Sequence, residues 1–386
     1  MGSKVVIVAM LLVVFSIGIK ASDPELTRDY SAPTGIDGNY FKSTVLKGVP
    51  TASAKFATVT GLNQNNFPAL VGLGVSSALL QFPPGSINPV HYHPRASELF
   101  YVIQGCLEVG LVDTMNKLFT ATICEGESFV FPKAMTHFQV NKGNVIAKGI
   151  VAFSSSNPGT SRLPNVLFKS GIADEPLMKS FGVAKSFVMA SRIAFASLFM
   201  VVFAIGVKAS DPELTSDYTA PLAGIDGTYF KSTVLKGVPV TSARFATVTG
   251  LNQNNFPALV GLGVSSALLQ FPPGSINPVH YHPRASEVFY VLQGCLDVGF
   301  VDTMNKLFTA TICEGESFVF PKAMTHFQIN RGLVTAKGIV AFSSSNPGTS
   351  RLPNVLFKSG IPDDVLMQSF GAGKLTINLL KFGIVN

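Results

Sequence analysis

The sequence predicts an all-β protein made of two barrels or jelly rolls in tandem, each followed by short helices. Apolar segments are short, alternate at period two and are bounded by Gly, Pro and Asn, as in "ELFYVIQGCLEVGLVD" and "KLFTATICEGESFVFP". Short strands with regular turn signals are typical of barrels and jelly rolls. The whole pattern occurs twice, and each copy closes with Pro and acidic residues before Leu-Met, which favours short helices.

The repeat divides the chain into two domains. Residues 61–98 recur without change at residues 250–287, and weaker similarity extends to both sides. Internal repetition over a span of ordinary domain size indicates two copies of one unit. We therefore assign a first domain to residues 22–182 and a second domain to residues 210–386.

Two apolar segments resemble export signals. Residues 1–21 place one Lys before an apolar run that ends at small residues, which is typical of a secretory signal peptide and short for a membrane span. Residues 183–209 contain a similar segment that ends in the same "KAS". We expect two secreted proteins joined in one chain, with a cut near Ala209; an apolar linker or a transmembrane helix is the alternative. Export leads to an oxidising compartment.

The composition narrows the class of protein. The 386 residues are 47% apolar and 13% charged, which suits a large core and excludes a disordered chain. The net charge of +7 is scattered, without a basic run or a nucleic-acid motif. We therefore expect no nucleic-acid partner, and only a weak affinity for an anionic cell-wall polysaccharide such as pectin.

Four cysteines lie at matching places in the two copies. Folding residues 106–124 as a hairpin centred near Met115 puts Cys106 opposite Cys124, and Cys295 and Cys313 repeat this spacing. Each pair could form a cross-strand disulfide or remain two small buried apolar side chains. We favour the unpaired alternative, because cross-strand positions often miss the Cα separation that a disulfide requires.

All six histidines belong to one repeated pattern. In "HYH", residues two apart share a face of a strand, Glu98 begins the next strand, and a third His arrives from a later hairpin. Three imidazoles and a carboxylate inside a barrel favour a metal site with room for water or substrate over histidines with a structural role; Mn, Fe, Zn or Cu would suit such ligands. The predicted ligands are His91, His93, Glu98 and His137, and His280, His282, Glu287 and His326.

These residues carry a family resemblance. The blocks around "HYHPRASE" and "FPKAMTH" resemble the two motifs of the cupin superfamily, and "GSINPVHYHPRASELFYVIQG" resembles the germin box of plant germin-like proteins. The resemblance covers nearly all of each copy. It implies two cupin jelly-roll barrels with C-terminal helices and one Mn²⁺ per domain on the eight ligands above. It also implies secretion to the apoplast or cell wall, and a homo-oligomer or pseudo-oligomer through barrels and C-terminal helices.

The same resemblance leaves three functions open. A germin-like metal site could dismutate superoxide to hydrogen peroxide in defence or development. Oxalate oxidation needs polar groups that orient a dianion. Asn88 and Asn277 match one substrate-binding amide, although an Asn before Pro is also a common turn residue. Ala78 and Ala267 replace the second amide, so we rank oxalate oxidase below superoxide dismutase. A non-catalytic wall, receptor or storage protein with a structural metal is the alternative class.

Overall fold

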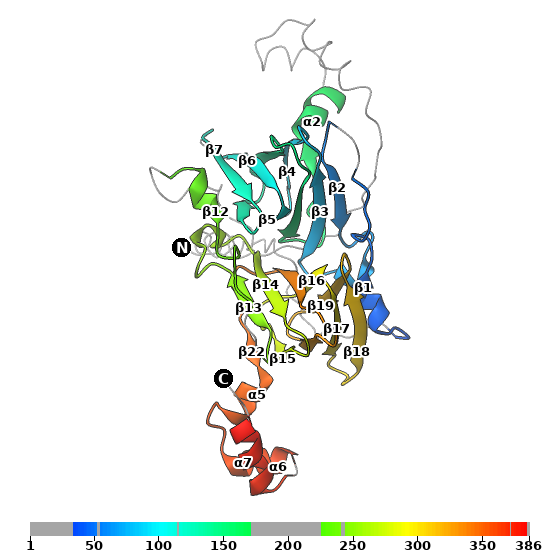
Figure 1. Ribbon diagram of the computed structural model, residues 1–386, viewed down its shortest axis with the longest axis vertical. Helices are drawn as coiled ribbons and strands as arrows, with labels where there is room; N and C mark the ends of the chain where they lie inside the picture. Colours follow the sequence, from blue (N-terminus) through cyan, green and yellow to red (C-terminus); the bar gives the residue numbers. More distant parts are fainter. Residues whose placement is uncertain are drawn as a thin grey trace, which may run out of the picture.

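The computed structural model describes residues 34–51, 55–113, 116–170, 225–240, 244–370 and 372–383. Within these ranges the chain forms two jelly-roll barrels of antiparallel strands, stacked along the long axis of the molecule (Figure 1). The predicted fold class is therefore confirmed. The predicted signal peptide, the similar segment at residues 183–209 and the cut near Ala209 lie outside the described residues.

The two halves contain the same elements in the same order. The first half has η1 (Gly38–Phe41), β1 (Lys42–Ser43), β2 (Thr58–Leu62), η2 (Pro68–Leu70), β3 (Ser76–Phe82), β4 (Ile87–Tyr92), β5 (Glu98–Gln104), β6 (Cys106–Val112), β7 (Leu118–Cys124), β8 (Ser128–Phe131), β9 (Thr136–Val140), β10 (Ala147–Phe153), β11 (Ser161–Arg162) and α2 (Leu163–Lys169). The second half has η3 (Gly227–Phe230), β12 (Lys231–Ser232), β13 (Thr247–Leu251), η4 (Pro257–Leu259), β14 (Ser265–Phe271), β15 (Ile276–Tyr281), β16 (Glu287–Gln293), β17 (Cys295–Val301), β18 (Leu307–Cys313), β19 (Ser317–Phe320), β20 (Thr325–Ile329), β21 (Ala336–Phe342), β22 (Ser350–Arg351), α5 (Leu352–Phe357), α6 (Asp363–Phe370) and α7 (Lys374–Gly383).

Each barrel consists of two sheets that face one another. In the first barrel a six-stranded sheet has the order β12-β8-β5-β10-β3-β2, and a five-stranded sheet has the order β11-β4-β9-β6-β7. The period-two pattern of the sequence explains which side chains point inward: along β9, His137 and Gln139 are buried while their neighbours are partly exposed. β3 lies between β2 and β10 and is buried along its whole length. The core therefore fills the space between the two sheets.

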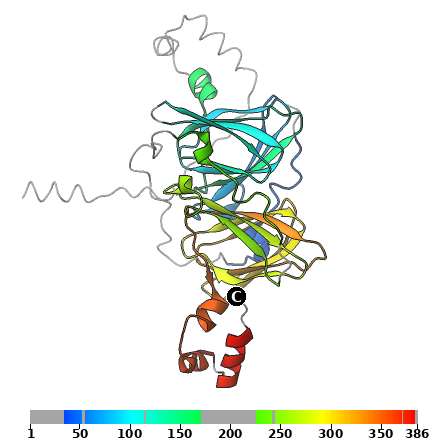
Figure 2. The same cartoon turned by 60° about the vertical axis from the view of Figure 1, so that its left-hand side comes forward.

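The halves exchange their N-terminal arms. We call residues 36–47 the first arm and residues 225–236 the second arm; their sequences differ only at Asn39 and Thr228. The first arm carries η1 and β1, and β1 pairs with β19 of the second barrel. The second arm carries η3 and β12, and β12 pairs with β8 of the first barrel. Figures 1 and 2 show the blue first arm against the lower, yellow barrel and the green second arm against the upper one.

One buried carboxylate holds each arm. In the first barrel Glu127 accepts hydrogen bonds from Lys231 and Lys236 of the second arm at 2.8 Å each, and from the backbone N–H of Cys124 at 2.9 Å. Burial alone would raise the pKa of Glu127, but these hydrogen bonds outweigh it and lower the pKa from 4.5 to about 2. In the second barrel Lys42 and Lys47 bind Glu316 in the same way.

The cysteines are paired, contrary to our expectation. Disulfides join Cys106 to Cys124 and Cys295 to Cys313. β6 and β7 set the first two residues directly opposite one another, with their Cα atoms 4.0 Å apart, so the strand register already supplies the short separation that a bridge needs. Cys106 is also exposed, which does not fit the alternative of two buried apolar side chains.

Short helices follow the strands in each half, as predicted. α2 follows β11 in the first half, and α5, α6 and α7 follow β22 in the second half and extend away from the barrels (Figure 1). Within the described residues, no helix combines the length and the apolar character needed to cross a membrane.

The pKa values of Glu127 and Glu316 predict acid-sensitive arm docking. Both carboxyls have a folded pKa of about 2 against an ordinary value of 4.5. Their stabilisation is therefore fully present above pH 4.5 and is lost as the pH falls towards 2. We expect the Glu127→Gln, Glu316→Gln variant to melt several degrees lower than the parent chain at pH 7, and this difference to shrink below pH 4. Thermal melts from pH 7 to pH 2.5 measure it; a constant difference would contradict the prediction.

Candidate metal centre

The four predicted ligands of the first barrel converge at one buried point. His91 near the end of β4 lies opposite His137 on β9, and His93 directly follows β4. Glu98 begins β5 in the facing sheet, so the ligands span both sheets of the barrel. One ligand atom from each residue lies within 4.8 Å of every other, and all four residues are buried. The structure thus brings together all four ligands that the sequence predicted.

Backbone carbonyls set the orientation of the three imidazole rings. Nδ1 of His91 lies 2.7 Å from the carbonyl oxygen of Pro89, and Nδ1 of His137 lies 2.8 Å from that of Met135. Nδ1 of His93 contacts the carbonyl oxygen of Gly159. Because a carbonyl can only accept, each Nδ1 carries the hydrogen, and the lone pair of each neutral ring is on Nε2.

The Nε2 atoms meet at Glu98. The carboxylate oxygen Oε2 lies 3.0 Å from Nε2 of His93 and 3.4 Å from Nε2 of His137. Nε2 of His137 is buried and has no hydrogen-bond partner. A buried, unpartnered nitrogen aimed at a carboxylate is costly unless a cation is bound between them. The residues therefore fit a metal ion held by three imidazoles and one carboxylate.

The charges of the site are those that a cation requires. Burial would raise the pKa of Glu98, but the imidazoles of His137 and His93 beside the carboxylate outweigh it and hold this pKa far below its ordinary range. Burial, together with the neighbouring His137 and His93, lowers the pKa of His91 to about 2. At neutral pH the site therefore presents an ionised carboxylate and a neutral His91, the forms that bind metal.

A second layer of amides supports the carboxylate. Nε2 of Gln139 donates to Oε1 of Glu98 at 3.3 Å, and Oε1 of Gln139 accepts from Nδ2 of Asn88 at 2.9 Å. Asn88 lines the cavity, as expected of a substrate-binding residue, but one of its two amide N–H groups already donates to Gln139. Gln139 was not among the predicted site residues, although its place two residues after His137 puts it on the same face of β9.

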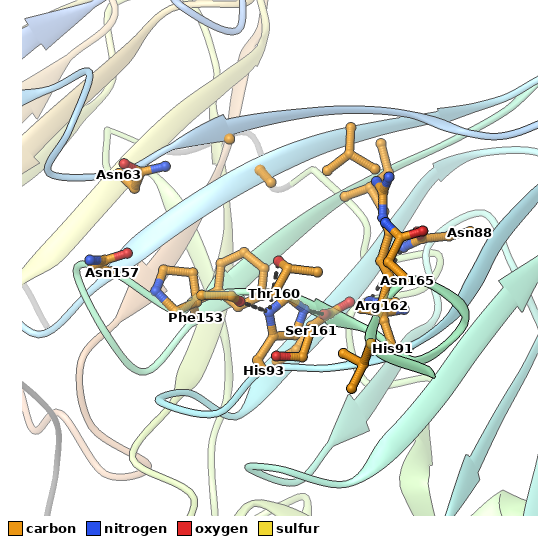
Figure 3. A pocket seen from close by; sticks show the side chains of 18 of the residues that line it. Asn63, Asn88, His91, His93, Phe153, Asn157, Thr160, Ser161, Arg162 and Asn165 are labelled. Atoms are coloured by element: carbon orange, nitrogen blue, oxygen red, sulfur yellow. Dashed lines mark hydrogen bonds and ion pairs between the residues drawn. The ribbon is translucent and has the colours of Figure 1, made fainter. Parts of the chain in front are cut away.

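A cavity of about 800 Å³ leads to the ligands (Figure 3). Figure 3 shows Arg162 and Asn165 beside Asn88 and His91, with Asn63 and Asn157 on the opposite side. Arg162 ends β11 and lies opposite His91 in the register with β4, which brings a cation close to the ligands. Within the described part of the chain Arg162 forms no ion pair. The sequence analysis also missed this residue.

Apolar side chains surround the imidazoles without closing the site. The ring of Phe131 stacks on His137 at a centroid distance of 4.4 Å, and Phe153 meets the edge of His93 at 4.7 Å. Ala134 lies in the turn between β8 and β9, where its φ is 61°, and its N–H donates to the carbonyl of His93. A side chain at positive φ is strained, and a glycine would relieve that strain.

The second barrel repeats the first. Its four predicted ligands are buried, and one ligand atom from each lies within 4.8 Å of every other. Hydrogen bonds from Asn277 to Gln328 and from Gln328 to Glu287 match the amide layer of the first site. A cavity of about 660 Å³ leads to these ligands. Arg351 takes the place of Arg162 at the mouth. The predicted second-site residues are His280, His282, Glu287 and His326, with Asn277 beside them.

Comparison with known proteins identifies relatives of each half. The sequence model of the family described as Cupin matches residues 44–189 and 233–378. A putative germin-like protein 9-2 of Oryza sativa subsp. japonica is 41% identical over 203 residues, which cover 49% of this chain and 95% of that protein. A rhicadhesin receptor of Pisum sativum is 42% identical over 164 residues, covering 42% of this chain and 76% of the relative.

Among solved structures, the paired arrangement of barrels has a counterpart. The structure of oxalate decarboxylase from Bacillus subtilis at pH 4.6 matches 92% of this chain and 87% of its own with a TM-score of 0.70 and 19% identity. At this identity the likeness is one of fold. It extends over both halves, so the double-barrel architecture is shared.

The geometry predicts two independent metal equivalents per chain. Replacing Glu98 by Gln removes the only charged ligand of the first site while keeping its shape, so we expect the bound divalent metal to fall from two equivalents to one. The Glu98→Gln, Glu287→Gln variant should retain none. Metal analysis after dialysis measures this, with Glu108→Gln, a surface carboxylate paired with Lys142, as the control. Two retained equivalents in the double variant would refute the assignment.

Proposed function

This chain belongs to the cupin family as two tandem germin-like copies, and from that premise we propose that it is a secreted plant protein that binds one Mn²⁺ in each barrel and dismutates superoxide. Two superoxide ions and two protons would give dioxygen and hydrogen peroxide, for use in defence or development. The observation that carries the proposal is a buried site of three histidines and one glutamate with an open cavity above it. A purely structural metal needs no such access.

The ligands suit a bound metal ion that gains and loses electrons. Mn²⁺, when bound, would supply the exchange of electrons. The protein's part is to hold the imidazole rings, through their Nδ1–carbonyl hydrogen bonds, in the orientation that turns Nε2 towards the ion, and to orient Glu98 through Gln139. The stacked ring of Phe131 restricts movement of His137. A fixed set of ligands needs little rearrangement when the charge of the ion changes.

An arginine at the mouth of each cavity supports an anionic substrate. Arg162 lines the cavity without an ion pair in the described residues, and Arg351 repeats this in the second barrel. A positive charge at the mouth of a cavity raises the local concentration of small anions. Superoxide carries one negative charge and needs no oriented binding.

Oxalate oxidation is the weaker candidate. A dianion bound at the metal needs donors at both ends. Asn88 is engaged by Gln139, and Ala78, which also lines the cavity, offers no donor. Asn277 and Ala267 take these places in the second barrel. We therefore keep oxalate oxidase below superoxide dismutase.

A non-catalytic role is the alternative from another class. The pea relative is named as a receptor, which supports a receptor, wall or storage protein whose metal is structural. Two features support secretion to the apoplast in either case: the disulfides, which form in oxidising compartments, and the apolar residues 1–21.

The same proposal includes self-association. Leu375, Leu379 and Phe382 on α7 are exposed and apolar, which supports an oligomer formed through the C-terminal helices. Barrel surfaces of net positive charge would add a weak affinity for acidic cell-wall polysaccharide.

Superoxide dismutation by the Mn-loaded chain tests the function. We expect activity proportional to bound Mn²⁺, about half of it after His93→Ala, and none after His93→Ala with His282→Ala, because one site remains in the first variant and none in the second. Circular dichroism checks that the variants remain folded. A fully loaded chain without turnover would refute the enzyme and favour the structural metal.

The two arginines predict a salt-dependent rate. Replacing Arg162 and Arg351 by Gln should lower the second-order rate constant several-fold at low ionic strength, and the deficit should fade in high salt as charges are screened. The matched control replaces Lys142 and Arg331 by Gln, which removes the same net charge from ion pairs outside the cavity. Equal rates and equal salt slopes in both variants would contradict steering by the mouth.

A further inference from the structure

Each arm completes a sheet that contains a metal ligand of the other half. β8 lies between β12 of the second arm and β5, and the first residue of β5 is Glu98. Without the arm, β8 would be an edge strand with unpaired backbone groups. Glu98 lies opposite Phe131 in this pairing. β12 of the arm therefore pairs with β8, and β8 in turn pairs with β5, the strand that carries the ligand Glu98.

A row of buried rings runs from the arm to a ligand. Phe230 of the second arm packs 6.0 Å from Phe129, and Phe129 packs 4.9 Å from Phe131. Phe131 then stacks on His137 at 4.4 Å, with the ring planes inclined by only 19°. All three phenylalanines are fully buried, so the row has no space into which it can relax. The position of His137 thus depends on a side chain from the other half.

The second barrel contains the same row with the halves reversed. Phe41 of the first arm packs 6.1 Å from Phe318, which packs 4.9 Å from Phe320. Phe320 stacks on His326 at 4.5 Å. The route from arm to ligand is therefore present twice, once in each direction.

The arms fit too closely to be loosely attached. A Cβ built on Gly227 would lie 1.8 Å from the carbonyl oxygen of Thr120, and one built on Gly38 would lie 1.7 Å from that of Thr309. Backbone meets backbone at these points, and neither side can move aside as a flexible side chain could. Lys117 and Lys306 close the contact by donating to the carbonyls of Ile225 and Ile36 at 2.7 Å each.

From these contacts we propose that each metal site is supported by the arm of the opposite half, so that the two halves act as one interlocked pair. Phe230 is a positioning residue for the first site, and Phe41 is a positioning residue for the second. The pair depends on the arms and not on the peptide that connects the halves. Cutting the chain between residue 182 and residue 210 would leave one particle with both sites intact.

Mn²⁺ binding by arm variants, measured with one site present at a time, tests whether each arm supports the metal site of the other half. In a chain whose second site is removed by His282→Ala, we expect Phe230→Leu to weaken Mn²⁺ binding at the first site several-fold. This is less than the roughly 10–100-fold cost of changing a direct partner of a ligand, because Phe230 acts on His137 through Phe129 and Phe131. Phe41→Leu should leave that site unchanged. In the chain with His93→Ala the two substitutions should exchange effects. Loss of metal from the arm's own half, or equal loss from both, would overturn the proposal.

A cut chain supplies a test that does not depend on metal affinity. With a protease site placed between residues 182 and 210, the cleaved protein should elute from gel filtration at the volume of the uncut chain and keep two Mn²⁺ equivalents. Chains that also carry Gly38→Ala and Gly227→Ala should separate after the same cleavage, because the arms can no longer dock. Separation of the halves with native arms would overturn the interlocked pair.

Discussion

The metal site exists only where two sheets are held face to face. The histidines come from β4, from the residue directly after it and from β9 in one sheet, and Glu98 comes from the start of β5 in the other. Their ligand atoms can converge only if the core between the sheets keeps its thickness, and that core is close-packed with large buried rings such as Phe82, Phe100 and Phe131. Packing, strand register and the chemistry of the site are therefore one constraint.

Polar contacts around the ligands decide which lone pairs and which charge face the metal position. The carbonyls of Pro89 and Met135 each lie two residues before the histidine they bind, so the local chain sets the tautomer of both rings. Gln139 orients the carboxylate of Glu98 by a hydrogen bond, as the carbonyls orient the rings. None of these contacts adds much stability alone, since a neutral hydrogen bond contributes about 1 kcal/mol. Together they leave three lone pairs and one negative charge aimed at the same place.

Much of this was predictable from sequence because the signals were local. Alternation at period two predicted the strands, and "HYH" with Glu98 predicted the ligands, since residues two apart share a face. Gln139 carried the same signal beside His137 and was overlooked. The hairpin expected around Met115 already placed Cys106 opposite Cys124, but the sequence alone did not give the Cα separation that allows the bridge. The exchange of arms had no signal in the sequence, because an arm that matches its own barrel matches the closely similar barrel of the other half equally well.

That last ambiguity has an evolutionary side. In an ordinary tandem repeat each copy can drift alone, because each copy packs against itself. Here the surface that receives the first arm is encoded in the second copy, and the reverse, so a change in one arm must be compatible with a barrel encoded far away in the chain. The arms differ at a single position, and Thr120, Glu127 and Phe129 have the same residue types as Thr309, Glu316 and Phe318. Reciprocal packing of this kind limits the changes that either copy can accept to those that fit the other copy, which constrains their divergence into separate specialised domains.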